Sequence, residues 1–331
     1  MSGTVVVAGA SGFIGRHLVD SFRRDGFTVT TIGRSGADAV WGDPDGIRTA
    51  LEGADLVVGL SGKSVNCRYT RANRAELLRS RLDTTLELAA GIRATTAPPK
   101  LWVNASTATI YRHAEDRPMT EATGELGEGF SVDIARAWES AFFDGALPAT
   151  RRVALRTSIV LGDGSVMVPY RWLVRLGLGG PQLDGTWFGT RARRAAGTFH
   201  QNRRTRGRQR FSWVHLDDVY GIIRFLQNRD DLDGVVNVTA PNPVDNRELM
   251  ATLRTVLRMP LGLPAFRWML ELGSILIRTE TELVLKSRWV LPERLTAAGY
   301  RFRHPDLDGA LRDILTPEPT STVVANSTSA R

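Results

Sequence analysis

Three glycines in one short turn are the residues of this sequence best suited to holding phosphate. Gly9, Gly12 and Gly15 are spaced three apart and follow directly on the apolar, β-branched run of residues 4–8. Apolar residues at helical spacing come next, so the pattern predicts a strand, a glycine turn and a helix. Such a turn lets backbone approach a pyrophosphate, and the helix N-terminus presents free N–H groups to it. The predicted dinucleotide ligands in this turn are Gly9, Ser11, Gly12, Phe13, Ile14 and Gly15.

The end of the second predicted strand indicates which dinucleotide is held. Residues 28–32 form this strand, and Arg34 and Ser35 follow it. In dinucleotide-binding folds an acidic residue about twenty positions after the glycines holds a ribose 2′-hydroxyl, whereas an arginine accommodates a 2′-phosphate. Arg34 and Ser35 therefore favour NADP(H) over NAD(H). The alternative for Arg34 is a solvated arginine at the end of a strand.

Further candidate cofactor ligands follow the next two predicted strands. A short strand at residues 39–43 ends in an aspartate that could reach an adenine edge, and residues 54–60 form another strand. Ligands of parallel α/β sheets sit beyond the carboxyl ends of the strands. We therefore predict cofactor contacts at Asp43, Leu60, Ser61 and Gly62.

A cluster of hydroxyl groups ends the fifth predicted strand, residues 101–105, where nicotinamide chemistry is expected. We predict that Ser106 bonds the cofactor and that Thr107 orients the reacting oxygen of a substrate. Tyr111 is a candidate for proton transfer, and the alternative is a packed aromatic residue at the strand end. Arg81, in a long predicted helix, either reaches the cofactor or an anionic substrate, or lies on the surface.

The elements that must position these residues are βα repeats with short connections. Right-handed crossovers fold such repeats into a doubly wound parallel sheet, so we expect an α/β Rossmann fold, with a sixth strand at residues 152–162. The dinucleotide-binding domain is expected over residues 1–165, with segments near 211–240 returning to it. Residues 166–315 are expected to form a smaller C-terminal α/β substrate domain. Residues 316–331, rich in Ser, Thr, Ala and Pro, are expected to be a disordered tail.

Positive charge is concentrated in one segment. The chain has 331 residues and a net charge of +8, and eight arginines with no acidic residue lie within residues 185–210. We expect this basic segment to be a mobile surface insertion, which leaves an anionic partner open. Nucleic acid is not expected as a partner, because no recognition motif accompanies the arginines.

The amino-acid composition indicates which broad class of protein the chain belongs to. Hydrophobic residues make up 42% and charged residues 24% of the chain, as in ordinary soluble globular proteins. Because no run of about eighteen apolar residues is present, we expect neither a membrane span nor a membrane partner. The one cysteine, Cys67, cannot form an internal disulfide, so we expect a cytoplasmic protein with no metal site.

Motifs spread over residues 3–315 resemble the extended short-chain dehydrogenase/reductase superfamily, which includes sugar-nucleotide epimerases. The broad resemblance rests on the glycine turn, the hydroxyl cluster before Tyr111, and Trp213-x-His215-x-Asp217-Asp218. A narrower resemblance is to an "epimerase family" subgroup (NAD-dependent epimerase/dehydratase-like) with its own small C-terminal domain. Its motifs match residues 80–85, 137–139, 155–162, 211–215, 240–244 and 287–295.

The resemblance implies a tyrosine with a lysine four residues later for proton transfer, and this chain lacks that pair. None of its three lysines has a tyrosine four residues before it, and by register the two positions are Ser131 and Ala135. For His215 we expect a hydrogen-bonded structural role, and for Asp217 and Asp218 the role of helix caps. Cys67 is expected to be inert.

Three functions remain open at this point. The first is an NADP(H)-binding oxidoreductase or epimerase-like enzyme that transfers hydride to or from a small carbonyl or alcohol, with Thr107 as polarising hydroxyl and an unassigned proton source. The second is an NADP(H)-binding sensor or scaffold with reduced catalysis. The third is a sugar-nucleotide epimerase. Members of the superfamily are commonly homodimers, so the resemblance implies a possible homodimer. The sequence does not indicate the substrate.

Overall fold

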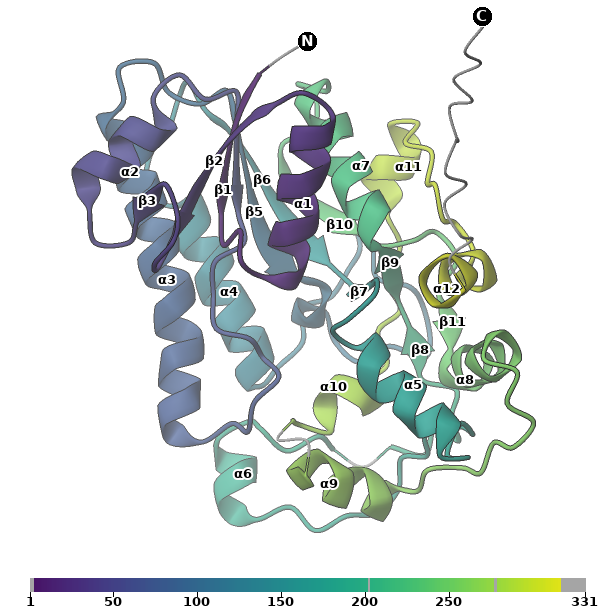
Figure 1. The fold of residues 1–331 in the computed structure, drawn as a ribbon. Helices are drawn as coiled ribbons and strands as arrows, with labels where there is room; N and C mark the ends of the chain where they lie inside the picture. The colour runs from purple at the N-terminus through teal and green to yellow at the C-terminus, as the bar shows by residue number, and fades with distance from the viewer. Residues whose placement is uncertain (1–2, 202, 277–278, 317–331) are drawn as a thin grey trace, which may run out of the picture.

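The fold is organised by a seven-stranded parallel sheet. The computed structural model describes residues 3–201, 203–276 and 279–316. The strands are β1 (Thr4–Ala8), β2 (Thr28–Gly33), β3 (Ala39–Val40), β4 (Leu56–Gly59), β5 (Leu101–Thr107), β6 (Arg151–Thr157) and β10 (Gly234–Val238). Their spatial order is β10-β6-β5-β4-β1-β2-β3, and all pairings are parallel (Figure 1). The predicted α/β Rossmann fold is therefore confirmed.

Helices cover both faces of this sheet because successive strand residues point to opposite faces. Val5 and Val7 of β1 pack with α1 (Phe13–Arg24) and α7 (Leu216–Gln227), whereas Val6 and Ala8 pack on the other side. The helices on that second side are α2 (Pro44–Leu51), α3 (Arg71–Ala94) and α4 (Phe130–Phe143). These two cores hold the carboxyl ends of the strands in fixed positions at one edge of the sheet.

The strand expected at residues 152–162 is broken at Ser158. Its backbone N–H bonds Val238 of β10, whereas the N–H of Ile159 bonds Ser212. The chain thereby leaves the large sheet, and β7 (Ile159–Leu161) pairs with β9 (Trp213–His215). The prediction of one continuous strand was wrong because a periodic apolar run does not reveal a change of sheet.

The remaining elements are the 3₁₀ turn η1 (Ala108–Ile110), α5 (Met167–Arg175), α6 (Arg191–Ala195), β8 (Arg210–Phe211), β11 (Val244–Asp245), α8 (Asn246–Val256), α9 (Arg267–Leu276), α10 (Glu282–Leu285), α11 (Glu293–Ala297) and α12 (Leu307–Leu315). Of these elements, α5, β8, α8 and α12 pack around a third core, whereas η1 and α11 pack on other clusters. Leu253 of α8 and Leu311 of α12 lie in the third core. Figure 1 shows α5, α6, α9 and α10 below the carboxyl edge of the large sheet. The proposed boundary at residue 165 stays a prediction.

The basic segment, residues 185–210, is packed against the fold rather than projecting as a mobile insertion. Its residues Thr198, His200 and Thr205 are buried. Arg193 forms ion pairs with Glu271 (3.4 Å) and Glu280 (3.1 Å), both of them buried. The sequence could not show this, because the acidic partners lie about eighty residues away.

Two further expectations concern the C-terminal tail and membrane-spanning helices. Beyond Thr316, the residues of the predicted disordered tail lie outside the described residues. Within residues 3–201, 203–276 and 279–316, no helix combines the length and apolar character needed to cross a bilayer.

Candidate functional site

The glycine turn has the shape of a phosphate cradle. Gly9 has φ +89°, and a Cβ there would lie 3.0 Å from the backbone of Leu60 and Ser61. A Cβ on Gly15 would collide with the carbonyl oxygen of Gly9. These two positions therefore require glycine, and they press the turn against the end of β4.

The N-terminus of α1 is open toward this turn. Gly12 is its N-cap and supplies no side-chain hydrogen bond, and the first turn contains no acidic residue. The backbone N–H groups at this end therefore keep their capacity to bind an anion. The ring of Phe13 lies over Gly162, where a Cβ would be 2.9 Å from it, and the carbonyl of Ser11 accepts a hydrogen bond from Arg16. Ile14 packs on the core and fixes the helix.

The end of β4 adds an unsatisfied polar atom. The hydroxyl of Ser61 is buried and has no hydrogen-bond partner among the described residues, which a ligand would supply. Arg81 of α3 lies beside Gly62, where a Cβ would be 3.1 Å from its Cγ. Its guanidinium donates to the carbonyl of Leu77 (2.8 Å) and stacks on Trp138. Arg81 is buried, so this cation lies inside the fold and not on the surface, and the burial lowers its pKa.

The predicted ribose and adenine contacts lie at the far strands. Arg34 is exposed directly after β2, and within the described part of the chain it has no acidic partner. Ser35, also exposed, follows it. Asp43 is used locally, because its carboxylate accepts the N–H of Gly46 (3.0 Å) and caps α2. Arg34 is thus available to bind a phosphate, whereas the carboxylate of Asp43 is already used to cap α2.

The hydroxyl cluster at the end of β5 divides into two kinds of residue. Ser106 donates to Glu139 (2.6 Å), whose carboxylate also receives two hydrogen bonds from Arg156 (2.8 and 2.7 Å). The hydroxyl of Thr107 accepts the backbone N–H of Thr109 (3.1 Å) and keeps its own proton available to donate. Thr107 is therefore the member of the cluster that is equipped to polarise a substrate oxygen.

Tyr111 lies in a buried network. Its side chain is 1% exposed, and its hydroxyl donates to Asn237 (2.9 Å) and accepts from Arg156 (3.0 Å). Burial raises the pKa of Tyr111, and the Arg156 guanidinium opposes that rise. With both hydrogen-bonding capacities used inside the protein, Tyr111 has no free phenol for a substrate.

A group of residues that the sequence did not reveal surrounds η1. Lys286 Nζ donates to the carbonyl oxygen of Thr109 (2.8 Å), and burial lowers the pKa of Lys286 to about 8. Glu282 lies 4.0 Å from that ammonium and accepts a hydrogen bond from Ser131 (3.1 Å). Ser131 also hydrogen-bonds Tyr69, whose pKa burial raises to about 12. A search for a lysine four residues after a tyrosine could not find this group, because its members come from the loop before α3, from α4 and from the end of α10.

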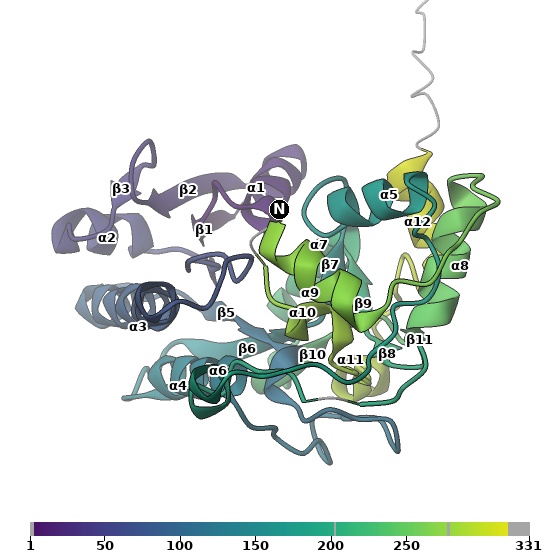
Figure 2. The ribbon, with the colours of Figure 1, turned by 90° about the horizontal axis from the view of Figure 1, so that it is seen from below.

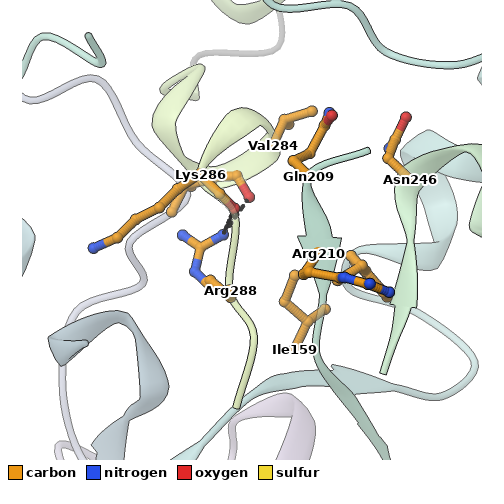
Figure 3. A pocket seen from close by; sticks show the side chains of 9 residues that line it. Ile159, Gln209, Arg210, Asn246, Val284, Lys286 and Arg288 are labelled. Carbon is orange, nitrogen blue, oxygen red and sulfur yellow. Dashed lines mark hydrogen bonds between the residues drawn. The ribbon is translucent and has the colours of Figure 1, made fainter. Parts of the chain in front are cut away.

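A small cavity borders this group (Figure 3). It encloses about 10 Å³, room for about one water molecule, between Ile159, Gln209, Asn246 and Arg288. The amino group of Lys286 points away from Gln209 and Asn246, on the opposite side of Arg288 (Figure 3). The cavity is too small for a substrate, and the amino group of Lys286 is bonded instead to Thr109 of η1.

The Trp-x-His-x-Asp-Asp motif has structural tasks. His215 Nδ1 accepts the N–H of Asp217 (3.2 Å) and caps α7, so the caps are not the aspartates. Asp217 pairs with His17 (3.2 Å), and buried Asp218 accepts the backbone N–H groups of Arg303 and His304. His215, Asp217, His304 and Asp313 lie close together. Because Nδ1 of neutral His215 accepts a hydrogen bond, its proton is on Nε2, the nitrogen that would have to bind a metal, so the cluster does not favour a metal site.

The one cysteine shows no sign of activation. Burial raises the pKa of the Cys67 thiol, whereas a reactive cysteine has a lowered pKa.

Comparison with known proteins defines the class. A model of the NAD dependent epimerase/dehydratase family matches residues 5–129, and a model of a domain of unknown function, DUF1731, matches residues 265–314. With the sheet order and glycine turn, these matches define an NAD(P)-binding protein with the fold of the extended short-chain dehydrogenases/reductases.

The relatives define the family. Epimerase family protein SDR39U1 of Bos taurus is 30% identical over 319 residues, covering 94% of this chain and 99% of that protein. Epimerase family protein YfhF of Bacillus subtilis (strain 168) is 27% identical over 331 residues, covering 96% and 99%. The crystal structure of human SDR39U1 (isoform 2) with NADPH has a TM-score of 0.79 and 28% identity, covering 94% and 98%. The chain belongs to this epimerase family, as its motifs predicted.

Proposed function

We propose that this protein binds NADP(H) along the carboxyl edge of its sheet and transfers hydride between it and a small carbonyl or alcohol. The observation that carries the proposal is the open cradle at this edge. The N-terminus of α1 has no side-chain cap, the buried hydroxyl of Ser61 has no hydrogen-bond partner among the described residues, and Arg81 lies against Gly62. The cofactor, when bound, supplies the hydride chemistry. The preference for NADP(H) rests on Arg34, which is exposed and has no acidic partner in the described part of the chain, and is supported by the NADPH in the structure of a relative.

Thr107 is proposed to orient the substrate. Its oxygen already accepts one hydrogen bond within η1, so its hydroxyl proton is directed elsewhere and is available to the substrate oxygen. Ser106 is held by Glu139 and supports the cofactor side only through its position at the end of β5.

Lys286 is proposed as the proton source. Its ammonium is fixed on the same turn as Thr107 through the carbonyl of Thr109, and it has two further N–H bonds to give. During reduction it would give one proton to the substrate oxygen and become a neutral amine. The neutral amine would regain its proton from water, and the carboxylate of Glu282, 4.0 Å away and held by Ser131, would favour the return to the ammonium form.

The test separates binding from chemistry. Titration of the purified protein with NADPH and NADH, followed by a panel of small carbonyl compounds, measures both steps on the native chain and on Thr107→Val. We expect turnover to be abolished in Thr107→Val while the NADPH affinity stays the same. Turnover that survives at the native rate would remove Thr107 from the mechanism, and failure to bind either nucleotide would end the whole proposal.

A sensor or scaffold is the second candidate function, because serine and alanine stand at positions 131 and 135, where the resemblance implies tyrosine and lysine. It predicts NADPH binding that changes partner binding, without NADPH oxidation by any member of the panel. Sugar-nucleotide epimerisation is the third candidate, and it requires a cofactor that stays bound through both hydride transfers. Loss of the cofactor during purification would argue against it. A cytoplasmic location and a homodimer remain proposals as well.

A further inference from the structure

Exposed apolar side chains gather at one end of the molecule. Of the fourteen large apolar side chains exposed within the described residues, ten lie between residues 168 and 275. These ten are Val168, Trp172, Leu176, Phe188, Leu261, Leu263, Phe266, Trp268, Leu272 and Ile275. Figure 2 looks onto this end, with α9 in the centre and α5 and α6 on either side. We refer to these ten residues as the apolar face.

Helix α9 contributes to this face with an exposed apolar side, and its polar side is buried. It buries Arg267, Glu271 and Ser274, which are at most 4% exposed. Trp268, Leu272 and Ile275, on the other side of the helix, are 54 to 59% exposed. A helix surrounded by water normally does the opposite. The polar side is tied inward, since Arg267 pairs with both Asp184 (2.7 Å) and Glu271 (2.7 Å), so the apolar side cannot turn inward without breaking buried ion pairs.

Helix α5 continues the same surface. Val168, Trp172 and Leu176 are four residues apart, lie on one side of α5 and its end, and are 46 to 69% exposed. Two backbone hydrogen bonds join this end to the segment before α9: Leu263 N–H to Gly177 (2.9 Å) and Gly180 N–H to Leu263 (3.0 Å). These bonds place the end of α5 next to the segment before α9, so the exposed apolar side chains of both helices lie at the same end of the molecule (Figure 2).

The segments that carry the apolar face are mostly basic, although exposed Asp163 pairs with Arg171 of α5 (3.3 Å). Residues 165–210 and 259–276 contain only two acidic residues, Asp184 and Glu271, and both side chains are buried in ion pairs. Exposed arginines in the same segments are Arg175, Arg191, Arg194, Arg203, Arg204, Arg206 and Arg208. The ion pair of Arg193 with Glu271 places α6 beside α9, and Figure 2 shows both helices at the same end of the molecule as the apolar face.

We infer that the apolar face, with the exposed arginines of the same segments, docks onto an anionic lipid surface. Apolar side chains enter the boundary between headgroups and acyl chains while arginines neutralise the headgroups, which is the arrangement of helices that lie on a membrane. A second copy of the chain fits less well, because two-fold pairing would place like charges opposite one another. Nucleic acid fits less well, because its backbone offers no partner for an apolar surface of this extent. The sequence-based expectation of no membrane partner considered only spanning segments, whereas a docking helix needs only one apolar side.

The experiment is co-sedimentation of the full chain with vesicles of pure phosphatidylcholine and with vesicles containing 30% phosphatidylglycerol. The apolar variant is Trp268→Ser with Leu272→Ser, and its control is Leu86→Ser with Leu126→Ser, two exposed apolar residues on other elements. The charge variant is Arg175→Gln with Arg191→Gln, and its control is Arg24→Gln with Arg301→Gln. None of these residues belongs to the proposed cofactor or substrate site.

We expect the native chain to bind the anionic vesicles at least tenfold more tightly than the neutral ones, with binding that weakens as salt increases. Both test variants should lose most of this binding, and both controls should retain it. Absence of vesicle binding, or equal binding by Trp268→Ser/Leu272→Ser and its control, would overturn the inference. It would also be overturned if the apolar variant abolished a concentration-dependent dimer, or if a DNA duplex bound more tightly than the vesicles. NADPH titration of the same variants keeps this test independent of the proposed function.

Discussion

Replacing Lys286 by methionine is expected to make the protein more stable at neutral pH. Methionine fills similar space without a charge, whereas the ammonium of Lys286 is buried and has, among the described residues, only Glu282 at 4.0 Å as a carboxylate neighbour. Burial lowers the pKa of Lys286 from 10.5 to about 8. Each pKa unit corresponds to about 1.4 kcal/mol, so holding the charged form inside the fold costs about 3 kcal/mol at pH 7.

The hydrogen bond from Lys286 to the carbonyl of Thr109 offsets part of that cost. Its loss is worth about 1 kcal/mol, which leaves a net gain of about 2 kcal/mol for Lys286→Met at pH 7. The folded protein binds fewer protons than the unfolded chain between about pH 8 and pH 10.5, so native stability from this group rises with pH across that window. The advantage of the variant should therefore shrink by about 2 kcal/mol between pH 7 and pH 9.5.

Urea unfolding of both proteins at pH 7 and pH 9.5 measures this difference directly. Lys100→Met is the matched control, because Lys100 is exposed and its pKa is raised by Asp55 instead of lowered by burial. A stability difference that does not change with pH, or a variant less stable than the native chain at pH 7, would refute the reasoning. A gain at pH 7 accompanied by loss of turnover would show that the buried charge is retained for function.

Two further predictions concern the cofactor edge and the support of the β5 hydroxyls. Arg34→Ala should weaken NADPH binding by about 1–2 kcal/mol, or roughly 5- to 30-fold, and leave NADH binding unchanged, because an exposed arginine loses one charge-assisted contact to a 2′-phosphate. Equal weakening for both nucleotides in a fluorescence titration would place Arg34 elsewhere. Arg156→Met should lower the free energy of unfolding by about 3 kcal/mol, since it leaves the largely buried carboxylate of Glu139 with Ser106 but without its cation. Arg79→Met, which breaks an exposed pair, should change stability little in the same denaturation experiment.

Features encoded by neighbouring residues were predictable from the sequence. The glycine turn needs only Gly9, Gly12 and Gly15 in their local context, and the structure shows the close approach that excludes a side chain at Gly9 and Gly15. The apolar repeats that form the large sheet are local in the same sense. Where a strand changed its partner at Ser158, the apolar pattern stayed the same and the prediction failed.

Features that depend on distant contacts were not predictable. Lys286 reaches Thr109 across 177 positions of the chain, and no local pattern marks either residue. Tyr111 and Ser106 belong to one network through Arg156 and Glu139, which explains why a hydroxyl cluster that looks catalytic is mostly structural. The buried acidic partners of Arg193 likewise hid the packing of the basic segment.

The return of β10 to the edge of the large sheet has a consequence for biosynthesis. When a ribosome has released the chain as far as residue 165, β6 is still an open edge, and the apolar side chains of Val153 and Leu155 lack the α7 helix that covers them in the finished protein. The missing strand and helix emerge about 70 residues later, a delay of about 4–15 s at ordinary rates of synthesis. During that interval the unpaired edge is exposed to other chains, so the nascent protein should depend on chaperones more than its Rossmann core alone would suggest.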